Sequence, residues 1–378
     1  MTTCTSSRAL AEVDVAAFIS NLKLAASLHS GDWLLPVIKA NGYGHGLETL
    51  ARALRGCVDV SLTGVAVASL AEARQLREND WTLPIVLLPG YVTAQECEQG
   101  AELLLDPVVH SLYQLDLIFA ASEKKAVQQP KRVWLKANTG MNRLGLIAED
   151  WHSAYGQLQR ADIDIVAMSH LACADELESS MSLQQQASFE VLLVDTTLKT
   201  ARSLAASGGV LAWPTTHYDI ARPGIMLYGS SPFAQRSAHS LGLKPVMTLR
   251  SRLLAINSIN KGDTVGYGAT FTADKPMRLG VVSIGYGDGY PRKAPTGTPV
   301  LVHTQNGPVR SQLVGRVSMD MITIDLTGIS AAIDDTVILW GEGLPADEIA
   351  EHCGTIAYEL FCQVTPRVPR IVKGAECG

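Results

Sequence analysis

The chain has 378 residues, of which 47% are hydrophobic and 18% charged, and its formal net charge is −6. This length exceeds what one hydrophobic core usually supports, so we expect two domains. The composition excludes a disordered chain, and the absence of a long run of Lys or Arg argues against nucleic acid or an anionic membrane as the main partner.

Eight short apolar runs alternate with helix-like segments from about residue 33 to residue 230. One predicted helix covers residues 69–78, where Ser69 and Glu72 form a capping box, and another covers residues 181–193. Apolar runs that are each followed by a crossover predict an α/β fold, a parallel sheet closed into a (β/α)8 TIM-type barrel. An open doubly wound sheet is the alternative. The runs lie at residues 34–38, 64–68, 84–88, 103–109, 132–136, 164–168, 204–206 and 224–228.

The pattern changes after residue 230 into short strands separated by Gly and Pro, which predicts a mostly β C-terminal domain. The polar stretch 232–243 marks the boundary. We expect residues 1–235 to form the barrel domain and residues 236–378 the β domain, with the option that the first residues pair with the β domain. The expected strands are 246–259, 278–284, 298–302, 321–325 and 336–340, and the expected helices are 344–351 and 355–361.

The seven cysteines are scattered and form no CxxC pair. This pattern favours free thiols in a reducing compartment and gives no support to a zinc site. The N-terminal residues lack the charged and apolar regions of a secretion signal, and no apolar stretch has the length that spans a bilayer. We therefore expect a cytoplasmic protein with neither membrane nor metal among its partners.

Residues 37–46 (VIKANGYGHG) end an apolar run on Lys39 and then break into a glycine-rich loop. Side chains at the carboxyl ends of barrel strands point into the active-site mouth. A partly desolvated lysine there loses its proton more easily and becomes a nucleophile toward aldehydes. We interpret Lys39 as the residue that carries a cofactor; a snorkelling surface lysine is the alternative.

The loops after the seventh and eighth apolar runs could hold a phosphate group. Phosphate sites in this barrel class often lie in these two loops. Here Ser207 offers a hydroxyl, and Gly224 and Ile225 offer backbone N–H groups. Two glycine-containing loops are weak evidence when they are taken alone.

A set of motifs that spans residues 37 to 370 resembles the alanine racemases, pyridoxal-phosphate (PLP) enzymes built from a barrel plus a β domain. The motifs appear in the order found in that family and cover nearly the whole chain. The first motif is highly specific together with the GYGAT and GRVSMD blocks. The matching stretches are 37–46, 135–145 (LKANTGMNRLG), 168–176 (MSHLACADE), 221–229 (ARPGIMLYG), 266–270 (GYGAT), 284–289 (IGYGDG), 315–320 (GRVSMD) and 367–370 (RVPR).

The resemblance implies a PLP cofactor in Schiff-base linkage to Lys39, with Arg222 facing the pyridine nitrogen. Arginine cannot accept the proton that an acidic partner would share with this nitrogen, which stays unprotonated. The substrate carbanion is then less delocalised into the ring, which favours prompt reprotonation at Cα and suits a racemase. The remaining cofactor-binding residues implied by the resemblance are Tyr43, Ser207, Gly224, Ile225 and Tyr228.

Racemisation removes a proton from one face of Cα and returns it to the other, which two bases do most simply. The resemblance makes Lys39 one base and Tyr267, from the second subunit of a homodimer, the other. A tyrosine is a poor base at neutral pH because its ordinary pKa is about 10. His170, linked onward to Arg222, is the implied helper. The alternatives are a plain turn residue for Tyr267 and a core histidine for His170.

The resemblance also implies how the substrate is held. Arg143, whose planar fork matches two carboxylate oxygens, and the backbone N–H of Met319 bind the substrate carboxylate. Lys136 is a candidate for carbamylation, and its carbamate would orient Arg143. The residues implied to line the substrate corridor are Asp175, Tyr286, Arg292 and Arg316, for which a solvated rim is the alternative.

The sequence departs from the family pattern at three positions. Asn138 stands where Asp is common, which weakens the case for carbamylation of Lys136. Pro366 replaces a Tyr that often helps to bind the phosphate, and Ala206 replaces an Asn. Neither of the last two removes a base or the cofactor lysine, but both could weaken cofactor affinity.

The sequence therefore predicts an isomerase, a PLP-dependent alanine racemase that serves peptidoglycan synthesis or alanine catabolism. A racemase of broader specificity, acting on serine or basic amino acids, is the first alternative. A non-catalytic PLP-binding protein is the second, and it is disfavoured because such proteins resemble only the barrel, whereas this chain retains Tyr267 and Met319.

Overall fold

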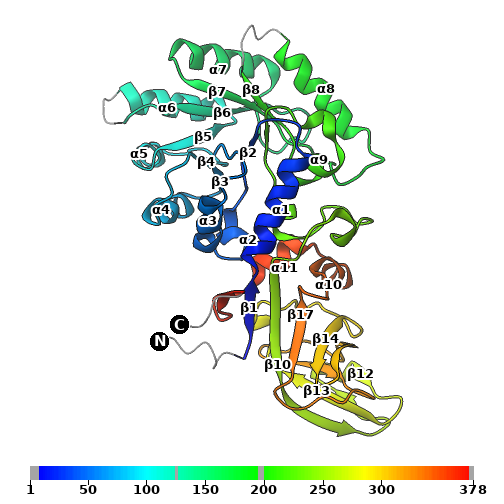
Figure 1. Ribbon diagram of the computed structural model, residues 1–378. Helices are drawn as coiled ribbons and strands as arrows, with labels where there is room; N and C mark the ends of the chain where they lie inside the picture. The colour runs from blue at the N-terminus through cyan, green and yellow to red at the C-terminus, as the bar shows by residue number, and fades with distance from the viewer. Residues whose placement is uncertain (1–7, 124–126, 195–199, 374–378) are drawn as a thin grey trace.

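A computed structural model describes residues 8–123, 127–194 and 200–373. The chain folds into a barrel of parallel strands ringed by helices and, beside it, a sheet-rich unit (Figure 1). The predicted fold class, an α/β barrel followed by a mostly β domain, is therefore confirmed. Among the described residues, no helix is both long enough and apolar enough to cross a membrane.

The barrel closes through eight parallel strands. Strands β3 to β8 form one continuous sheet in chain order, and β2 pairs with β9. The bridges Val37–Ala66 and Ala206–Arg222 join these two sheets on either side, which completes the ring. The barrel strands are β2 (Trp33–Leu34), β3 (Val65–Val67), β4 (Ile85–Leu87), β5 (Leu105–Val109), β6 (Arg132–Lys136), β7 (Asp164–Met168), β8 (Ala201–Ser203) and β9 (Ile220–Ala221).

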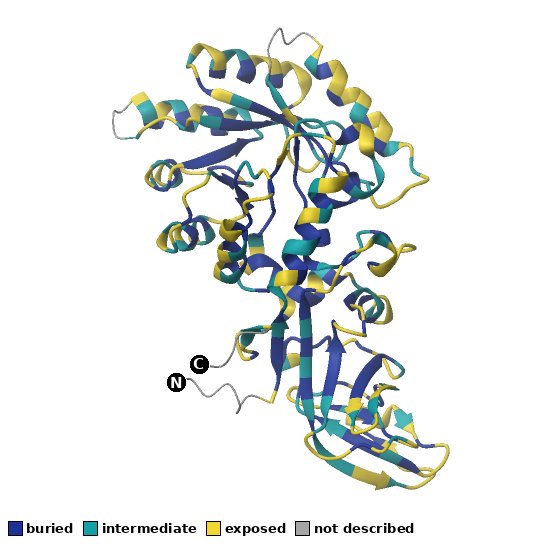
Figure 2. Ribbon diagram, in the orientation of Figure 1, coloured by how far each residue is buried: buried dark blue, intermediate teal, exposed yellow. Residues whose placement is uncertain are grey.

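Helices surround the barrel, and their outer faces are exposed while the strands are buried (Figure 2). The strands are short and apolar because both of their faces are covered. The predicted helix at residues 181–193 is confirmed. The helices of this unit are α1 (Val15–Leu28), α2 (Lys39–Tyr43), α3 (Leu47–Gly56), α4 (Leu70–Glu78), α5 (Ala94–Glu102), α6 (Leu112–Glu123), α7 (Ala148–Arg160), α8 (Met181–Leu193) and α9 (Ser207–Ala212).

The last two strand predictions of the barrel are wrong in position. Residues 224–228 are not the eighth strand but a 3-10 helix, η2 (Ile225–Tyr228), in which the Leu227 N–H donates to the Gly224 carbonyl at 2.8 Å. The eighth strand is the two-residue β9, and Pro223 follows it closely with no N–H to extend the ladder. A short apolar run reads the same as a buried helical turn or a buried strand. The seventh strand, β8, likewise ends before residue 204.

The second unit is built around the long strand β10 (Met247–Ile259), which pairs with β13 and β17. The segment before the barrel also joins this sheet, because β1 (Leu10–Val13) pairs with β10 and with β18 (Arg370–Val372). The other elements are β11 (Thr264–Val265), β12 (Phe271–Thr272), β13 (Met277–Val282), β14 (Pro299–Thr304), β15 (Gly307–Gln312), β16 (Ile322–Asp325), β17 (Thr336–Trp340), α10 (Ala346–Cys353) and α11 (Ala357–Gln363).

Candidate active site

Lys39 lies at the carboxyl end of the first barrel strand. Ile38 donates its N–H to the carbonyl of Ala66 at 3.0 Å, and the chain leaves the barrel wall at the next residue. Burial lowers the pKa of Lys39, and the positive charge of Arg143 lowers it further, while Cys362 and Glu72 oppose the shift. A half-buried amine with a lowered pKa is more often in the neutral, nucleophilic form.

The four residues after Lys39 form a left-handed turn. Ala40, Asn41, Gly42 and Tyr43 have φ values of 53°, 54°, 60° and 49°. Left-handed backbone costs an L-residue about 1–2 kcal/mol, so consecutive positions in this region persist only where the surroundings hold them. One such support comes from helix α4, where a carboxylate oxygen of Glu72 accepts the N–H of Asn41 at 3.2 Å.

The residues predicted to bind phosphate come together beside this turn. The hydroxyl oxygen of Ser207 accepts the N–H of Gly224 at 2.9 Å, which leaves the hydroxyl proton free to be donated. Tyr43 as a residue is 8% exposed, and its hydroxyl has no hydrogen-bond partner among the described residues. The hydroxyl lies close to Gly224, because a Cβ added to that glycine would be 2.8 Å from it. The N–H of Ile225 also has no acceptor in this part of the chain. These donors fit a phosphate group.

Tyr228 is placed differently from the other predicted cofactor residues. Its hydroxyl donates to the carbonyl of Val37 at 3.0 Å, so its proton is already used. Its ring stacks on that of Tyr43 with centroids 4.5 Å apart. Tyr228 therefore supports the backbone before Lys39 and the ring of Tyr43.

Arg222 is buried and held by four acceptors. Its guanidinium donates to the Ser203 hydroxyl at 2.6 Å, to the Ser169 carbonyl at 2.6 Å and to the Leu204 carbonyl at 3.2 Å, and it lies 3.3 Å from His170 Nδ1. Burial lowers the pKa of Arg222 to about 10, so the group stays charged at neutral pH. Its Nε–H has no acceptor among the described residues, which suits a ligand that offers a neutral ring nitrogen.

Lys136 and Arg143 extend a cluster of positive charge around Lys39. Burial and, to a lesser degree, the positive charges of Arg222, Arg143 and Lys39 lower the pKa of Lys136 to about 8. The side-chain oxygen of Asn138 accepts the N–H groups of Gly140 and Asn142 at 3.1 Å each. The amide at residue 138 therefore shapes the loop that leads to Arg143.

Most other predicted site residues lie in the β unit and face solvent. Tyr267 is 73% exposed and Met319 is 52% exposed. Arg316 lies beside the Tyr267 turn, since a nitrogen atom of its guanidinium is 3.0 Å from the position that a Cβ added to Gly268 would occupy. Tyr286 and Arg292 border a neighbouring hollow on the same unit, and Asp175 is exposed on the barrel.

One chain does not bring Tyr267 to Lys39. The charged and titratable groups that act on Lys39 are Arg143, Cys362 and Glu72. In Figure 1, helix α2 lies at the junction of the two units, whereas strand β12, next to the Tyr267 turn, lies far along the β unit. The two predicted bases are therefore separate within the subunit.

Glu72 is a site residue that the sequence interpretation missed. The predicted capping box is confirmed in one half, because the Ser69 hydroxyl accepts the Glu72 N–H at 3.2 Å. The carboxylate of Glu72, however, accepts the N–H groups of Ala68 and Asn41 in place of that of Ser69. The position of Glu72 at the start of a helix was a signal for a cap, but no local pattern indicated a contact with the Lys39 turn.

The half-buried Lys39 at the barrel mouth lies in one site with a set of hydrogen-bond donors and the Arg222–His170 pair, and a β unit is attached to the barrel. This arrangement fits an amino-acid racemase of two domains, which the family matches show. The alanine racemase N-terminal domain family matches residues 13–232, and the alanine racemase C-terminal domain family matches residues 246–372. The chain belongs to the alanine racemase family.

Individual relatives agree over nearly the full length. The chain is 47% identical over 365 residues to an alanine racemase of Alcanivorax borkumensis, covering 96% of this chain and 98% of the relative. The biosynthetic alanine racemase of Pseudomonas aeruginosa is 42% identical, with a TM-score of 0.90 over 97% of this chain and 99% of that one. The alanine racemase of Bartonella henselae, solved with covalently bound pyridoxal phosphate, is 28% identical, with a TM-score of 0.84 over 97% and 99% of the two chains.

Proposed function

We propose that this protein interconverts L- and D-alanine with PLP carried on Lys39. The observation that carries the proposal is the partly desolvated Lys39 amine at the barrel mouth, in the same site as a buried Arg222 whose Nε–H has no acceptor among the described residues. The membership of the chain in the alanine racemase family supports the reaction, and the PLP of the Bartonella henselae relative supports the cofactor.

Bound PLP would supply an electron sink that makes the substrate Cα–H acidic. The Tyr43 hydroxyl, the Ser207 hydroxyl and the Ile225 N–H would hold its phosphate, whereas the Gly224 N–H, which the sequence predicts for the same role, already donates to Ser207. Arg222 would donate Nε–H to the ring nitrogen and, being charged, would not protonate it fully. This limits charge delocalisation and favours prompt return of the proton to Cα over side reactions.

Two residues would move that proton from opposite faces. Lys39 serves one face, and Tyr267 of the partner subunit serves the other. The exposure of Tyr267, and the separation of helix α2 from strand β12 within one subunit (Figure 1), support a homodimer with shared sites. In this arrangement each subunit contributes two domains. We propose that residues 1–235, without strand β1, form the barrel domain, and that residues 236–378, together with strand β1, form the β domain.

The substrate carboxylate would bind Arg143 and the Met319 N–H of the partner subunit. Lys136 lies among three positive groups, and its pKa of about 8 leaves part of its amine neutral at physiological pH. Only a neutral amine reacts with carbon dioxide, and the resulting carbamate would offset this positive charge and orient Arg143. We include carbamylated Lys136 in the proposal. The corridor through which the substrate enters would be lined by Asp175, Tyr286, Arg292 and Arg316.

Absorption spectroscopy and chemical trapping test the proposal. The purified protein is expected to show the visible band of a lysine-bound PLP, and borohydride reduction followed by peptide mapping is expected to place the label on Lys39. Addition of either enantiomer of alanine should then produce the other. A protein that stays colourless with added PLP, or that carries the label on another lysine, would refute the assignment. Serine, lysine and arginine, tested in parallel, define the specificity.

A further inference from the structure

The left-handed turn after Lys39 also carries Tyr43, so it places two proposed cofactor residues at once. Four hydrogen bonds close the turn internally: Gly42 N–H to Ile38, Gly44 N–H to Ala40, His45 N–H to Gly42 and Gly46 N–H to Asn41, at 2.8–3.0 Å. These bonds do not offset left-handed strain at Ala40, Asn41 and Tyr43, because a right-handed turn would make similar ones. External contacts must therefore hold the turn.

Arg370, the last residue of the RVPR motif, makes one of these contacts across 326 positions of sequence. Its Nε–H donates to the carbonyl oxygen of Gly44 at 3.0 Å. The other nitrogen atoms of its guanidinium donate to the carbonyls of Thr365 at 2.8 Å, Val368 at 3.0 Å and Val364 at 2.5 Å. Four carbonyl oxygens thus fix the planar guanidinium group of Arg370. A lysine, which has a single ammonium nitrogen, cannot make the same set of hydrogen bonds.

The turn also lies against helix α11, which precedes the segment that bears Arg370. Gly44 has a φ of 77°, and a Cβ there would lie only 2.1 Å from the carbonyl oxygen of Phe361. The buried His45 ring packs edge-on against Phe361, with ring centroids 5.0 Å apart, and its Nδ1 lies 2.8 Å from the carbonyl of Tyr43. Helix α11 and the Arg370 side chain therefore both approach the turn closely at Gly44.

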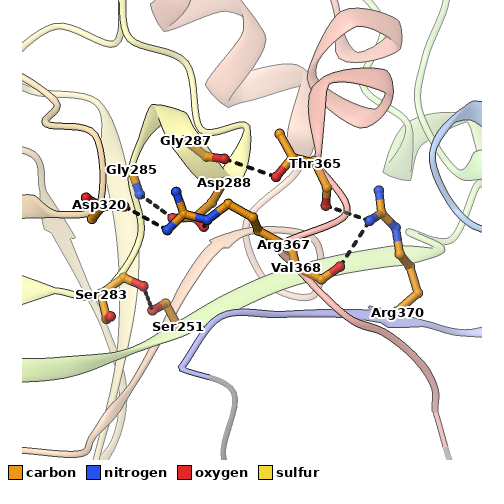
Figure 3. A network of polar contacts seen from close by, with 10 residues as sticks. All are labelled: Ser251, Ser283, Gly285, Gly287, Asp288, Asp320, Thr365, Arg367, Val368 and Arg370. Atoms are coloured by element: carbon orange, nitrogen blue, oxygen red, sulfur yellow. Dashed lines mark hydrogen bonds and ion pairs between the residues drawn. The ribbon is translucent and has the colours of Figure 1, made fainter.

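The segment that bears Arg370 is itself tied to the β unit (Figure 3). The Thr365 hydroxyl donates to the Gly287 carbonyl at 3.1 Å, and the Thr365 N–H donates to the Asp288 carbonyl at 3.0 Å. Arg367 pairs with Asp288 at 3.3 Å and with Asp320 at 2.7 Å. Arg370 thus contacts the Lys39 turn from a segment that the β unit holds in place.

We propose that Arg370 is a positioning residue for the cofactor: by holding the Gly44 carbonyl, it keeps the left-handed turn in the conformation that presents Lys39 and Tyr43 to PLP. Glu72 holds the same turn at a second point, through the Asn41 N–H. This inference rests on the proposed function, because it takes Lys39 and Tyr43 as cofactor residues. It assigns a role to the RVPR motif, which the proposed reaction does not otherwise use.

A purely structural role for Arg370 is the competing explanation. In that case the residue only fastens strand β18 to the segment 364–368, and its loss lowers the stability of the whole sheet. A positioning role instead predicts a local effect on the turn and on PLP affinity. The two explanations differ in which peptides loosen and in whether PLP binding changes.

The experiment compares the full-length wild type with Arg370→Lys and Arg370→Gln. Arg252→Lys is the matched control, because the guanidinium of Arg252 also bonds to a distant part of the chain, through an ion pair to Asp334 at 2.7 Å, and Arg252 lies on a strand of the same sheet. Three quantities are measured: hydrogen exchange of peptides covering residues 39–46 and 370–373 in protein stripped of PLP, the dissociation constant of PLP, and the fraction of PLP trapped on Lys39 by borohydride.

Both Arg370 variants are expected to exchange faster at residues 39–46 than the wild type and to bind PLP about tenfold more weakly or worse, as expected when one charged hydrogen bond is lost. Arg252→Lys is expected to leave both quantities unchanged. Wild-type exchange at residues 39–46, or wild-type PLP affinity, in Arg370→Lys would overturn the inference. Faster hydrogen exchange that is confined to residues 370–373 in the Arg370 variants would also overturn the inference.

The result also separates this inference from the proposed function. A wild type that never carries PLP on Lys39 contradicts the proposed function and removes the inference with it. If the wild type is labelled on Lys39 and the Arg370 variants bind PLP with unchanged affinity, the proposed function stands. Only the inference about Arg370 is then rejected. If Arg370→Gln does not fold, Arg370→Lys, which keeps the charge, decides the outcome.

Discussion

The Nη2 atom of Arg222 lies 3.3 Å from Nδ1 of His170. Burial and, to a lesser degree, the positive charge of Arg222 and its cationic neighbours lower the pKa of His170 to about 3, so the imidazole is neutral at physiological pH. Arginine can only donate, so Nδ1 is the acceptor and the ring proton resides on Nε2. His170 therefore offers an N–H donor, suited to stabilising an anionic oxygen such as that of Tyr267 from the partner subunit.

Replacement of His170 by Phe should lower kcat by about 10²-fold, because the proposed tyrosine base loses the donor that stabilises its anion. The pH–rate profile should also shift to more alkaline pH. Since the pKa of His170 is about 3, its own protonation cannot explain any change in the wild-type rate between pH 5 and pH 9. Equal profiles for the variant and the wild type would exclude His170 from the relay.

Mixing two inactive variants should restore activity if the site is shared. Lys39→Ala and Tyr267→Phe are each expected to be inactive as pure dimers. Random exchange of subunits gives one intact site in each mixed dimer, so the mixture should recover about a quarter of wild-type activity. The measurement is racemisation after co-refolding, with each variant refolded alone as the control. Failure to recover activity while mixed dimers form would place both bases in one subunit.

Removal of dissolved carbon dioxide should lower activity, and bicarbonate should restore it. The neutral fraction of Lys136 increases as the pH rises through about 8, so carbamylation should be greater at pH 8.5 than at pH 6.5. Carbon NMR with isotopically labelled bicarbonate detects the carbamate directly. Lys136→Gln should be insensitive to carbon dioxide. A wild type equally active in rigorously degassed buffer would show that the bare lysine suffices.

Replacement of Gly44 by Ala should lower the free energy of unfolding by about 2–4 kcal/mol, from left-handed strain plus a clash with Phe361. Gly354 is the matched control, because it also has a positive φ, of 63°, but nothing lies within 4 Å of the place of its Cβ. Gly354→Ala should cost only about 1–2 kcal/mol. Urea unfolding of both variants, without PLP, separates strain from close packing; equal costs would mean that Phe361 moves aside.

The order of elements and the identity of the proposed cofactor lysine could be predicted from the sequence. Apolar runs separated by helical patterns indicated the barrel because strands covered on both faces need continuous apolar residues. Lys39 was noticeable because a charged residue ended such a run before several glycines. The motif set from residue 37 to residue 370 indicated the family, which the two domain matches establish.

Only the tertiary structure determined which short apolar run formed the last strand, and which distant groups met at the Lys39 turn. Residues 224–228 are apolar because they are buried, and burial alone does not distinguish a strand from a helical turn. Glu72 and Arg370 bind the turn through backbone N–H and carbonyl groups, which nearly every residue carries regardless of its side chain and which no sequence pattern reveals. Local periodicity thus predicts elements, whereas contacts between backbone groups far apart in sequence exist only once the chain has folded.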